Sequence, residues 1–89
     1  MKITKKVDEH GIIRYRNEQG KLHREDGPAV ERTNGYKEWY LNGKLHREDG
    51  PAIEYADGDK SWYINDIEYS EQDYNDYLLK KRLKRILEL

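Results

Sequence analysis

The sequence contains no cysteine, no long run of apolar residues and almost no net charge. Without cysteine neither a disulfide framework nor a thiolate metal site can form, and a cytosolic location is permitted. No stretch approaches the roughly 18 apolar residues of a membrane-spanning helix. Residues 1–6 lack the apolar core of a signal peptide. The net charge of -1 confines any affinity for nucleic acid to a local patch.

Apolar residues are scarce, at 35% of the 89 residues, while charged residues make up 39%. Such a composition is typical of disorder when charges of one sign dominate and aromatic residues are few. Here 18 acidic and 17 basic residues nearly cancel, and 8 tyrosines and 2 tryptophans supply rigid apolar surface. We therefore expect a single folded domain over residues 1–89, with a thin core and a mixed-charge surface.

An internal duplication organises the chain. Residues 20–31, GKLHREDGPAVE, return as GKLHREDGPAIE at residues 43–54, so the period is 23 residues. The Trp-Tyr pairs at 39–40 and 62–63 keep the same register. A worn copy precedes them if one residue is inserted, with Tyr15 in the place of the first tryptophan. The sequence therefore contains about three units, the first worn and the third truncated.

Turn signals separate short segments rich in Val, Ile, Tyr and Trp, and such segments predict strands. Asn34-Gly35, Asn42-Gly43 and Asp57-Gly58 favour two-residue type I′ hairpins, in which both central residues take a positive φ. We therefore predict a mainly β fold over residues 1–69, an antiparallel hairpin-repeat meander of about three 23-residue units. Eight apolar side chains are expected in its core: Leu22, Val30, Trp39, Leu41, Leu45, Ile53, Trp62 and Ile64.

The pattern changes after Tyr69. Ser70 and the acidic residues that follow it resemble a capping box, so residues 70–89 predict one C-terminal, amphipathic, basic α-helix. Its acidic residues come early and its basic residues late, which suits the helix dipole. Helical spacing places four apolar residues on one stripe: Leu79, Leu83, Ile86 and Leu87.

Two interpretations of this helix stay open. The stripe caps the open end of the hairpin stack and the basic residues are solvated, or the helix contacts a partner protein or phosphates. The stripe also suits a homodimer with a second copy of the chain. The candidate partner-binding residues are Tyr74, Tyr77, Lys80, Lys81, Arg82, Lys84 and Arg85.

The His-Arg-Glu-Asp tetrads at 23–26 and 46–49 are the residues most suggestive of chemistry, since a histidine beside acids suits acid–base catalysis or metal binding. Their recurrence and the lack of a second ligand at suitable spacing favour a polar structural turn instead. The other interpretation is a small-ligand or nucleotide pocket built from His23, Arg24, His46 and Arg47. No phosphate loop, catalytic triad order or zinc-type spacing appears, so we predict no catalytic residue, metal or cofactor.

The phrases GKLHREDGPA, KEWYLNG and SWYIND resemble a repeat common in small bacterial and bacteriophage proteins, akin to MORN-type hairpin repeats. The resemblance covers residues 11–70, although residues 65–69 depart from it and the third unit lacks the tetrad. It implies a hairpin-repeat fold and a cytoplasmic protein of a bacterial host, with a protein-binding or inhibitory role, for some relatives as antitoxin components. It carries over no functional residue.

These observations predict a non-enzymatic protein-binding module, an inhibitor or antitoxin-like factor that blocks a host or toxin protein. RNA or DNA binding through the basic helix is the second hypothesis. A small-ligand or nucleotide sponge with pockets between the repeats is the third.

Overall fold

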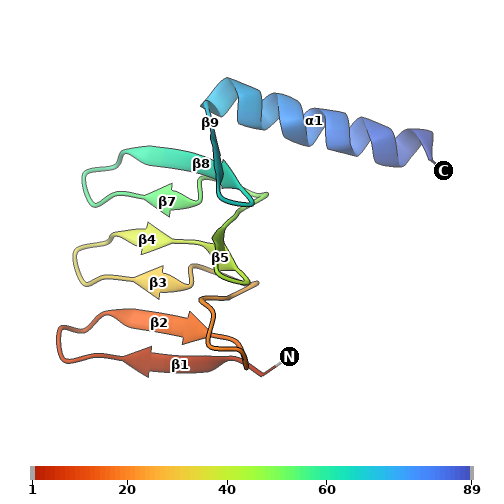
Figure 1. Ribbon diagram of the computed structural model, residues 1–89. Coiled ribbons are helices and arrows are strands. Elements are labelled where there is room, and N and C mark those ends of the chain that lie inside the picture. The colour runs from red at the N-terminus through yellow and green to blue at the C-terminus, as the bar shows by residue number, and fades with distance from the viewer. Residues whose placement is uncertain (1, 89) are drawn as a thin grey trace.

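Short strands and one helix build residues 2–88, the part of the chain that the computed structural model describes. The predicted fold, an antiparallel hairpin meander with one C-terminal helix, is confirmed. Figure 1 shows three main hairpins stacked side by side, with the helix leaving from the end of the stack. The elements are β1 Thr4–Val7, β2 Ile13–Arg16, β3 Val30–Glu31, β4 Lys37–Glu38, β5 Tyr40–Leu41, β6 Lys44–Leu45, β7 Ile53–Glu54, β8 Lys60–Ile64, β9 Ile67–Tyr69 and α1 Glu71–Leu87.

Each complete unit combines a main hairpin with a second, shorter hairpin. The main hairpins form an antiparallel sheet in the order β1-β2-β3-β4-β7-β8-β9, and β5 and β6 pair separately. In the middle unit, β3 pairs with β4 and the chain then bends at Trp39 into the β5–β6 hairpin. In the third unit β8 pairs first with β7 and then with β9, so it serves both hairpins. The stack therefore repeats with the period of the sequence.

Two kinds of turn close these hairpins. Asn42-Gly43 and Asn65-Asp66 are two-residue turns in which both residues have a positive φ, as type I′ requires. At Asn34-Gly35 and Asp57-Gly58 the predicted type is wrong, because only the glycine has a positive φ (95° in each) and the loop has three residues. There the Asn34 and Asp57 carboxamide or carboxylate oxygens accept a backbone N–H two residues on, which favours a type I turn followed by a bulged glycine.

The residue inserted into the first unit lies in its second turn. Asn17 opens a three-residue loop that ends at Gly20, whereas the equivalent loop at Asn42-Gly43 has two residues. The buried Asn17 side chain accepts the N–H groups of Gln19 and Lys21 and donates to Asn42 Oδ1 at 3.0 Å. The longer loop is therefore tied to the turn of the next unit.

The core is thinner than the sequence predicts. Of the eight residues expected there, Val30, Ile53 and Ile64 are buried. Both tryptophans and the three leucines are half-buried, because the molecule measures 49 × 33 × 17 Å and is one sheet thick over most of its length. Ala29 and Ala52, which follow the prolines, are fully buried and were not predicted.

The helix begins where predicted. Ser70 is its N-cap, with Oγ accepting the N–H of Asp73 at 3.1 Å, and acidic residues occupy its first turn and basic residues its last. Only its first turns pack on β8 and β9, and the remainder extends away from the stack (Figure 1). Within residues 2–88 no helix is long and apolar enough to cross a membrane.

Candidate functional site

The two histidines of the tetrads fasten one unit to the next. The buried His23 ring accepts the backbone N–H of Asn42 at Nδ1, at 2.8 Å. His46 accepts the N–H of Asn65 in the same way, at 3.1 Å, and its Nε2 lies 3.0 Å from Glu48 Oε2. An accepting nitrogen carries no proton, so this geometry assigns the proton to Nε2. Each histidine thus satisfies the type I′ turn that lies 19 residues further along the chain.

The arginines of the tetrads organise their own loops. The Arg47 guanidinium carbon lies 3.8 Å from the centre of the Trp39 ring. Its Nε donates to Asp49 at 2.7 Å, and its Nη1 donates to Pro51 O and to Glu54, each at 3.0 Å. The Arg47 side chain is only 18% exposed, so its bonds to Pro51 O and Glu54 are partly shielded from water, whereas Asp49 is 85% exposed.

Arg24 repeats this arrangement one unit earlier. Its guanidinium carbon lies 4.1 Å from the centre of the Tyr15 ring, and its Nε and Nη1 donate to Asp26 and Pro28 O at 3.0 and 3.2 Å. Tyr15 therefore does in the worn unit what Trp39 does in the next.

A glycine follows each tetrad because the arginine lies against it. A Cβ built on Gly27 would lie 2.9 Å from Arg24 Cζ, and one on Gly50 would lie 2.8 Å from Arg47 Cζ. Neither glycine has a positive φ, so the arginine alone restricts these positions.

We expect Gly27→Ala to lower the free energy of unfolding by about 1–3 kcal/mol, the range for overpacking. In an Arg24→Ala background the same change should cost almost nothing, since the clashing group is gone. Urea unfolding of the two single variants and the double variant gives the coupling energy. Equal costs in both backgrounds would contradict the packing explanation.

These networks favour the structural interpretation of the tetrads over a pocket of His23, Arg24, His46 and Arg47. Both arginines and both Nδ1 atoms are engaged within the fold. Within residues 2–88, His23 Nε2 is the one buried side-chain nitrogen or oxygen without a hydrogen-bond partner, and it lies 3.5 Å from Glu25 Oε1. No three potential metal ligands cluster in the same range. The absence of catalytic residues stays a prediction.

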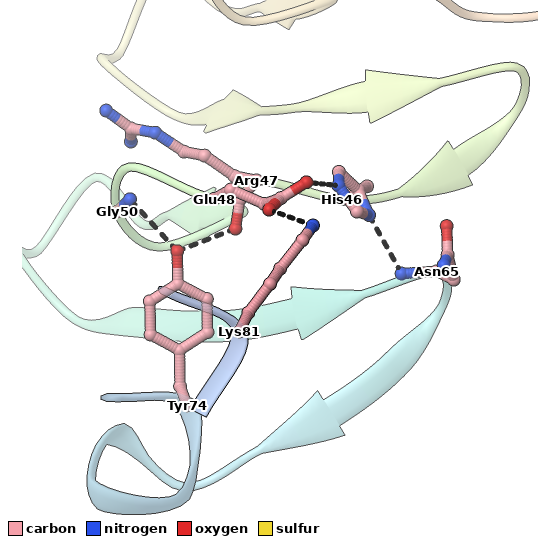
Figure 2. A network of polar contacts seen from close by, with 7 residues as sticks. All are labelled: His46, Arg47, Glu48, Gly50, Asn65, Tyr74 and Lys81. Atoms are coloured by element: carbon pink, nitrogen blue, oxygen red, sulfur yellow. Dashed lines mark hydrogen bonds and ion pairs between the residues drawn. The ribbon is translucent and has the colours of Figure 1, made fainter. Parts of the chain in front are cut away.

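Tyr74 anchors the helix to the stack (Figure 2). Its hydroxyl donates to Arg47 O at 2.7 Å and accepts the N–H of Gly50 at 3.1 Å, and its ring centre lies 6.5 Å from that of Trp62. The side chain is 2% exposed, and burial raises the pKa of its phenol. Tyr74 was a candidate partner-binding residue. Its partner-binding role stays a prediction, and in this structure its surface and its hydroxyl are used inside the fold.

Two further candidates also hold the helix in place. Tyr77 is half-buried with its ring centre 5.8 Å from that of Tyr69. Lys81 Nζ lies 2.6 Å from Glu48 Oε1, so the second tetrad contacts both the third unit and the helix (Figure 2). Tyr74, Tyr77, Leu78 and Lys81 follow helical spacing, and these positions were the sequence signal for the packing face.

The Lys81 pair makes this contact sensitive to acid. The hydrogen bond from Lys81 lowers the pKa of the Glu48 carboxyl below its ordinary value of 4.5. Its contribution to stability is therefore complete above pH 4.5 and is lost as the pH falls through the lower folded value. We expect Lys81→Gln to raise the pKa of Glu48, as measured by an NMR titration. A Glu48 pKa that does not move would contradict the pair.

The second half of α1 presents an apolar stripe to solvent. Leu79, Leu83, Ile86 and Leu87 are 54, 49, 62 and 85% exposed. Leu79 follows Tyr74 by five positions, which turns it about 140° away from the packing face. The expectation that this stripe caps the hairpin stack is wrong, because the residues of the first turns do so.

The remaining candidate residues share this exposed half. They are four basic residues, and none of them forms an ion pair with another residue of the range 2–88, in contrast to Lys81. We refer to residues 79–87, apart from Lys81, as the free half of α1. The four are Lys80, Arg82, Lys84 and Arg85.

Comparisons of the chain with protein-family models, curated proteins and solved structures find no match. The resemblance to MORN-type repeats therefore stays a prediction.

Proposed function

We propose that this chain is a non-enzymatic protein-binding module that inserts the free half of α1 into an apolar groove of a partner protein. The observation that carries the proposal is the stripe of four apolar side chains, each about half exposed or more. Exposed apolar surface of this kind marks interaction sites in soluble proteins. Spacing of i, i+4, i+7 and i+8 is that of a helix bound in a groove.

The architecture suits this role. A helical segment as short as the free half of α1 is marginally stable by itself in water, so anchoring the first turns of the helix through Tyr74 keeps this half helical before binding. Preorganisation of this kind reduces the ordering cost of association. The exposed basic residues beside the stripe favour a groove with an acidic rim.

Occupying a partner's groove would block it, and this is the mechanism by which we propose that the protein acts as an inhibitor or antitoxin-like factor. The resemblance to repeats of bacterial and phage proteins extends the proposal to a target in the bacterial cytoplasm, either a host protein or a toxin.

A second candidate function is RNA or DNA binding by the exposed bases of the free half of α1. It is favoured by the absence of ion pairs at Lys80, Arg82, Lys84 and Arg85 within residues 2–88. Such binding would weaken steeply with added salt.

One affinity-capture experiment from host-cell extract separates these functions. Wild-type protein is expected to retain a protein that Leu83→Glu fails to retain, while its unfolding free energy changes by less than about 0.5 kcal/mol. Ile67→Glu is the matched control, because Ile67 is as exposed as the stripe but lies on β9. Retention of nucleic acid alone, lost in Lys84→Gln/Arg85→Gln but kept in Leu83→Glu, would overturn protein binding and support the second function.

A further inference from the structure

Within residues 2–88, the first strand of the stack has one edge without a partner. β1 begins the order of the main sheet and pairs with β2 alone, so its other edge lies open at the end of the stack (Figure 1). Tyr15, which lies opposite Lys5, donates its N–H away from β1, to Ala29 O at 2.8 Å. In an antiparallel pair such opposite residues both point outward, so Lys5, and Val7 two residues on, direct their backbone N–H and C=O groups to the open edge.

Opposite charges face one another across the middle of this sheet. Glu31 on β3 lies opposite Lys37 on β4, and Lys37 lies opposite Glu54 on β7. Glu54 in turn lies opposite Lys60 on β8. Cross-strand pairs of opposite charge stabilise neighbouring strands. In this part of the sheet, a basic residue is therefore matched by an acidic residue on the next strand.

β1 and β2 lack this alternation of charge. Lys6 lies directly opposite Arg14, which is a pair of like charges. Arg14 has Asp8 as its counter-ion at 2.8 Å, whereas neither Lys5 nor Lys6 forms an ion pair within residues 2–88. All four residues of β1 are exposed. A strand that supplies the missing opposite charge to β1 is therefore acidic.

The two faces of β1 differ in character. Successive side chains of a strand alternate between faces, so Lys6 lies on one face, whereas Ile3 and Val7 lie on the other. Ile3 and Val7 are 38 and 59% exposed. Lys5 shares their face, with Nζ 6.0 Å from the centre of the Tyr15 ring. A hollow of about 510 Å³ separates this face from the first tetrad, so the face offers apolar surface and room for side chains.

We infer that the open edge of β1 is a second docking surface, which takes an extended acidic segment of a partner protein as an additional strand. The backbone of the segment bonds to the outward N–H and C=O groups of Lys5 and Val7. Its acidic side chains lie beside Lys6, and the apolar side chains between them contact the other face. The acidic residues belong beside Lys6 because the first tetrad brings the exposed carboxylates of Glu25 and Asp26 to the other face.

A second copy of the chain fits this edge poorly. Antiparallel pairing of two β1 strands over most of their length places Lys5 opposite Lys5, or Lys6 opposite Lys6. Lysines on an edge strand hinder pairing between like strands in this way. The open edge of β1 lies at the end of the stack remote from α1 (Figure 1), so the inference does not rest on the function proposed for the helix.

A synthetic peptide of sequence Glu-Val-Glu-Val-Glu-Val is the probe, and its matched control carries Lys in place of each Glu. Added to isotope-labelled full-length protein, the acidic peptide is expected to shift the Lys5 and Val7 amide NMR signals in a saturable manner. It should also slow hydrogen exchange of both amides. The basic peptide should bind at least about 5-fold more weakly, because favourable cross-strand pairs become unfavourable ones.

Variants of the full-length chain test the backbone and the charge separately. Val7→Pro removes an outward N–H that β2 does not use, so it should weaken binding about 5-fold or more, the value of one hydrogen bond. Val7→Thr keeps that N–H and should bind within about 2-fold of wild type. Lys6→Glu should weaken binding of the acidic peptide at least about 5-fold. Lys44→Glu makes the same charge change on β6 and should leave binding unchanged.

Three results would overturn the inference. They are equal affinities for the acidic and the basic peptide, Lys5 and Val7 amides that do not respond to the acidic peptide, and peptide-free protein whose Val7 signal shifts with concentration as β1 pairs with a second copy.

Discussion

Replacing Tyr74 with alanine is expected to lower the free energy of unfolding by about 3–5 kcal/mol, the range for large buried aromatic side chains. The change removes the ring that packs on Trp62 and leaves Arg47 O and Gly50 N without their bridge. Because α1 contacts the stack mainly through its first turns, the helix should also detach. Chemical unfolding gives the energy, and helical circular dichroism under native conditions reports the detachment.

Two matched variants show which part of Tyr74 matters. Tyr74→Phe keeps the ring and should cost about 1–2 kcal/mol for the lost hydrogen bonds. Leu83→Ala, on the exposed stripe of the same helix, should cost less than about 0.5 kcal/mol. If Tyr74→Ala were no more damaging than Leu83→Ala, the anchoring role would be refuted.

Replacing Arg47 with alanine is expected to cost about 2–4 kcal/mol, since several charge-assisted hydrogen bonds are lost together. The guanidinium stacks on Trp39 and bonds to Asp49, Glu54 and Pro51 O, so its removal opens the core side of the loop and leaves Glu54 without its cation. The same loop carries the two backbone groups that bind Tyr74. Thermal unfolding followed through the tryptophan signal measures the loss.

The conservative variant Arg47→Lys separates charge from shape. Lysine keeps the charge but has neither the planar fork nor the stacking surface, so most of the loss should remain. Arg24→Ala should be destabilising in the same manner, because Arg24 repeats the geometry on Tyr15. A wild-type stability for Arg47→Lys would show that charge alone suffices and would contradict the stacking explanation.

In this stack, the histidine of each tetrad binds the turn of the following unit, and the second tetrad also binds the helix. In repeat proteins of this kind stability is the sum of units and of the contacts between adjacent units, and the ends need caps. In the first two units an arginine stacks on the aromatic ring, Arg24 on Tyr15 and Arg47 on Trp39. In the third unit Tyr74 packs on Trp62 instead and so caps the stack. Binding of the free half of α1 to the proposed partner would therefore leave the contacts that hold the stack in place.

The period of this fold and the positions of its turns are local properties, and the sequence alone determined them. The 23-residue repeat, the type I′ turn at Asn42-Gly43 and the start of α1 at Ser70 depend on residues close together in the chain. The same holds for the expectation that the tetrads are structural turns, because their recurrence reflects a recurring local geometry.

Contacts between distant residues were decided only by the tertiary structure. The face of α1 that packs on the stack depends on the direction in which β9 delivers the chain. It buries Tyr74 and leaves the stripe of Leu83 in solvent, although the stripe is the more apolar face in sequence. The histidine bonds to Asn42 and Asn65 likewise form only once the units are stacked, because each spans 19 residues. A period in sequence specifies which residues are equivalent, and packing of one unit on the next specifies what each of them touches.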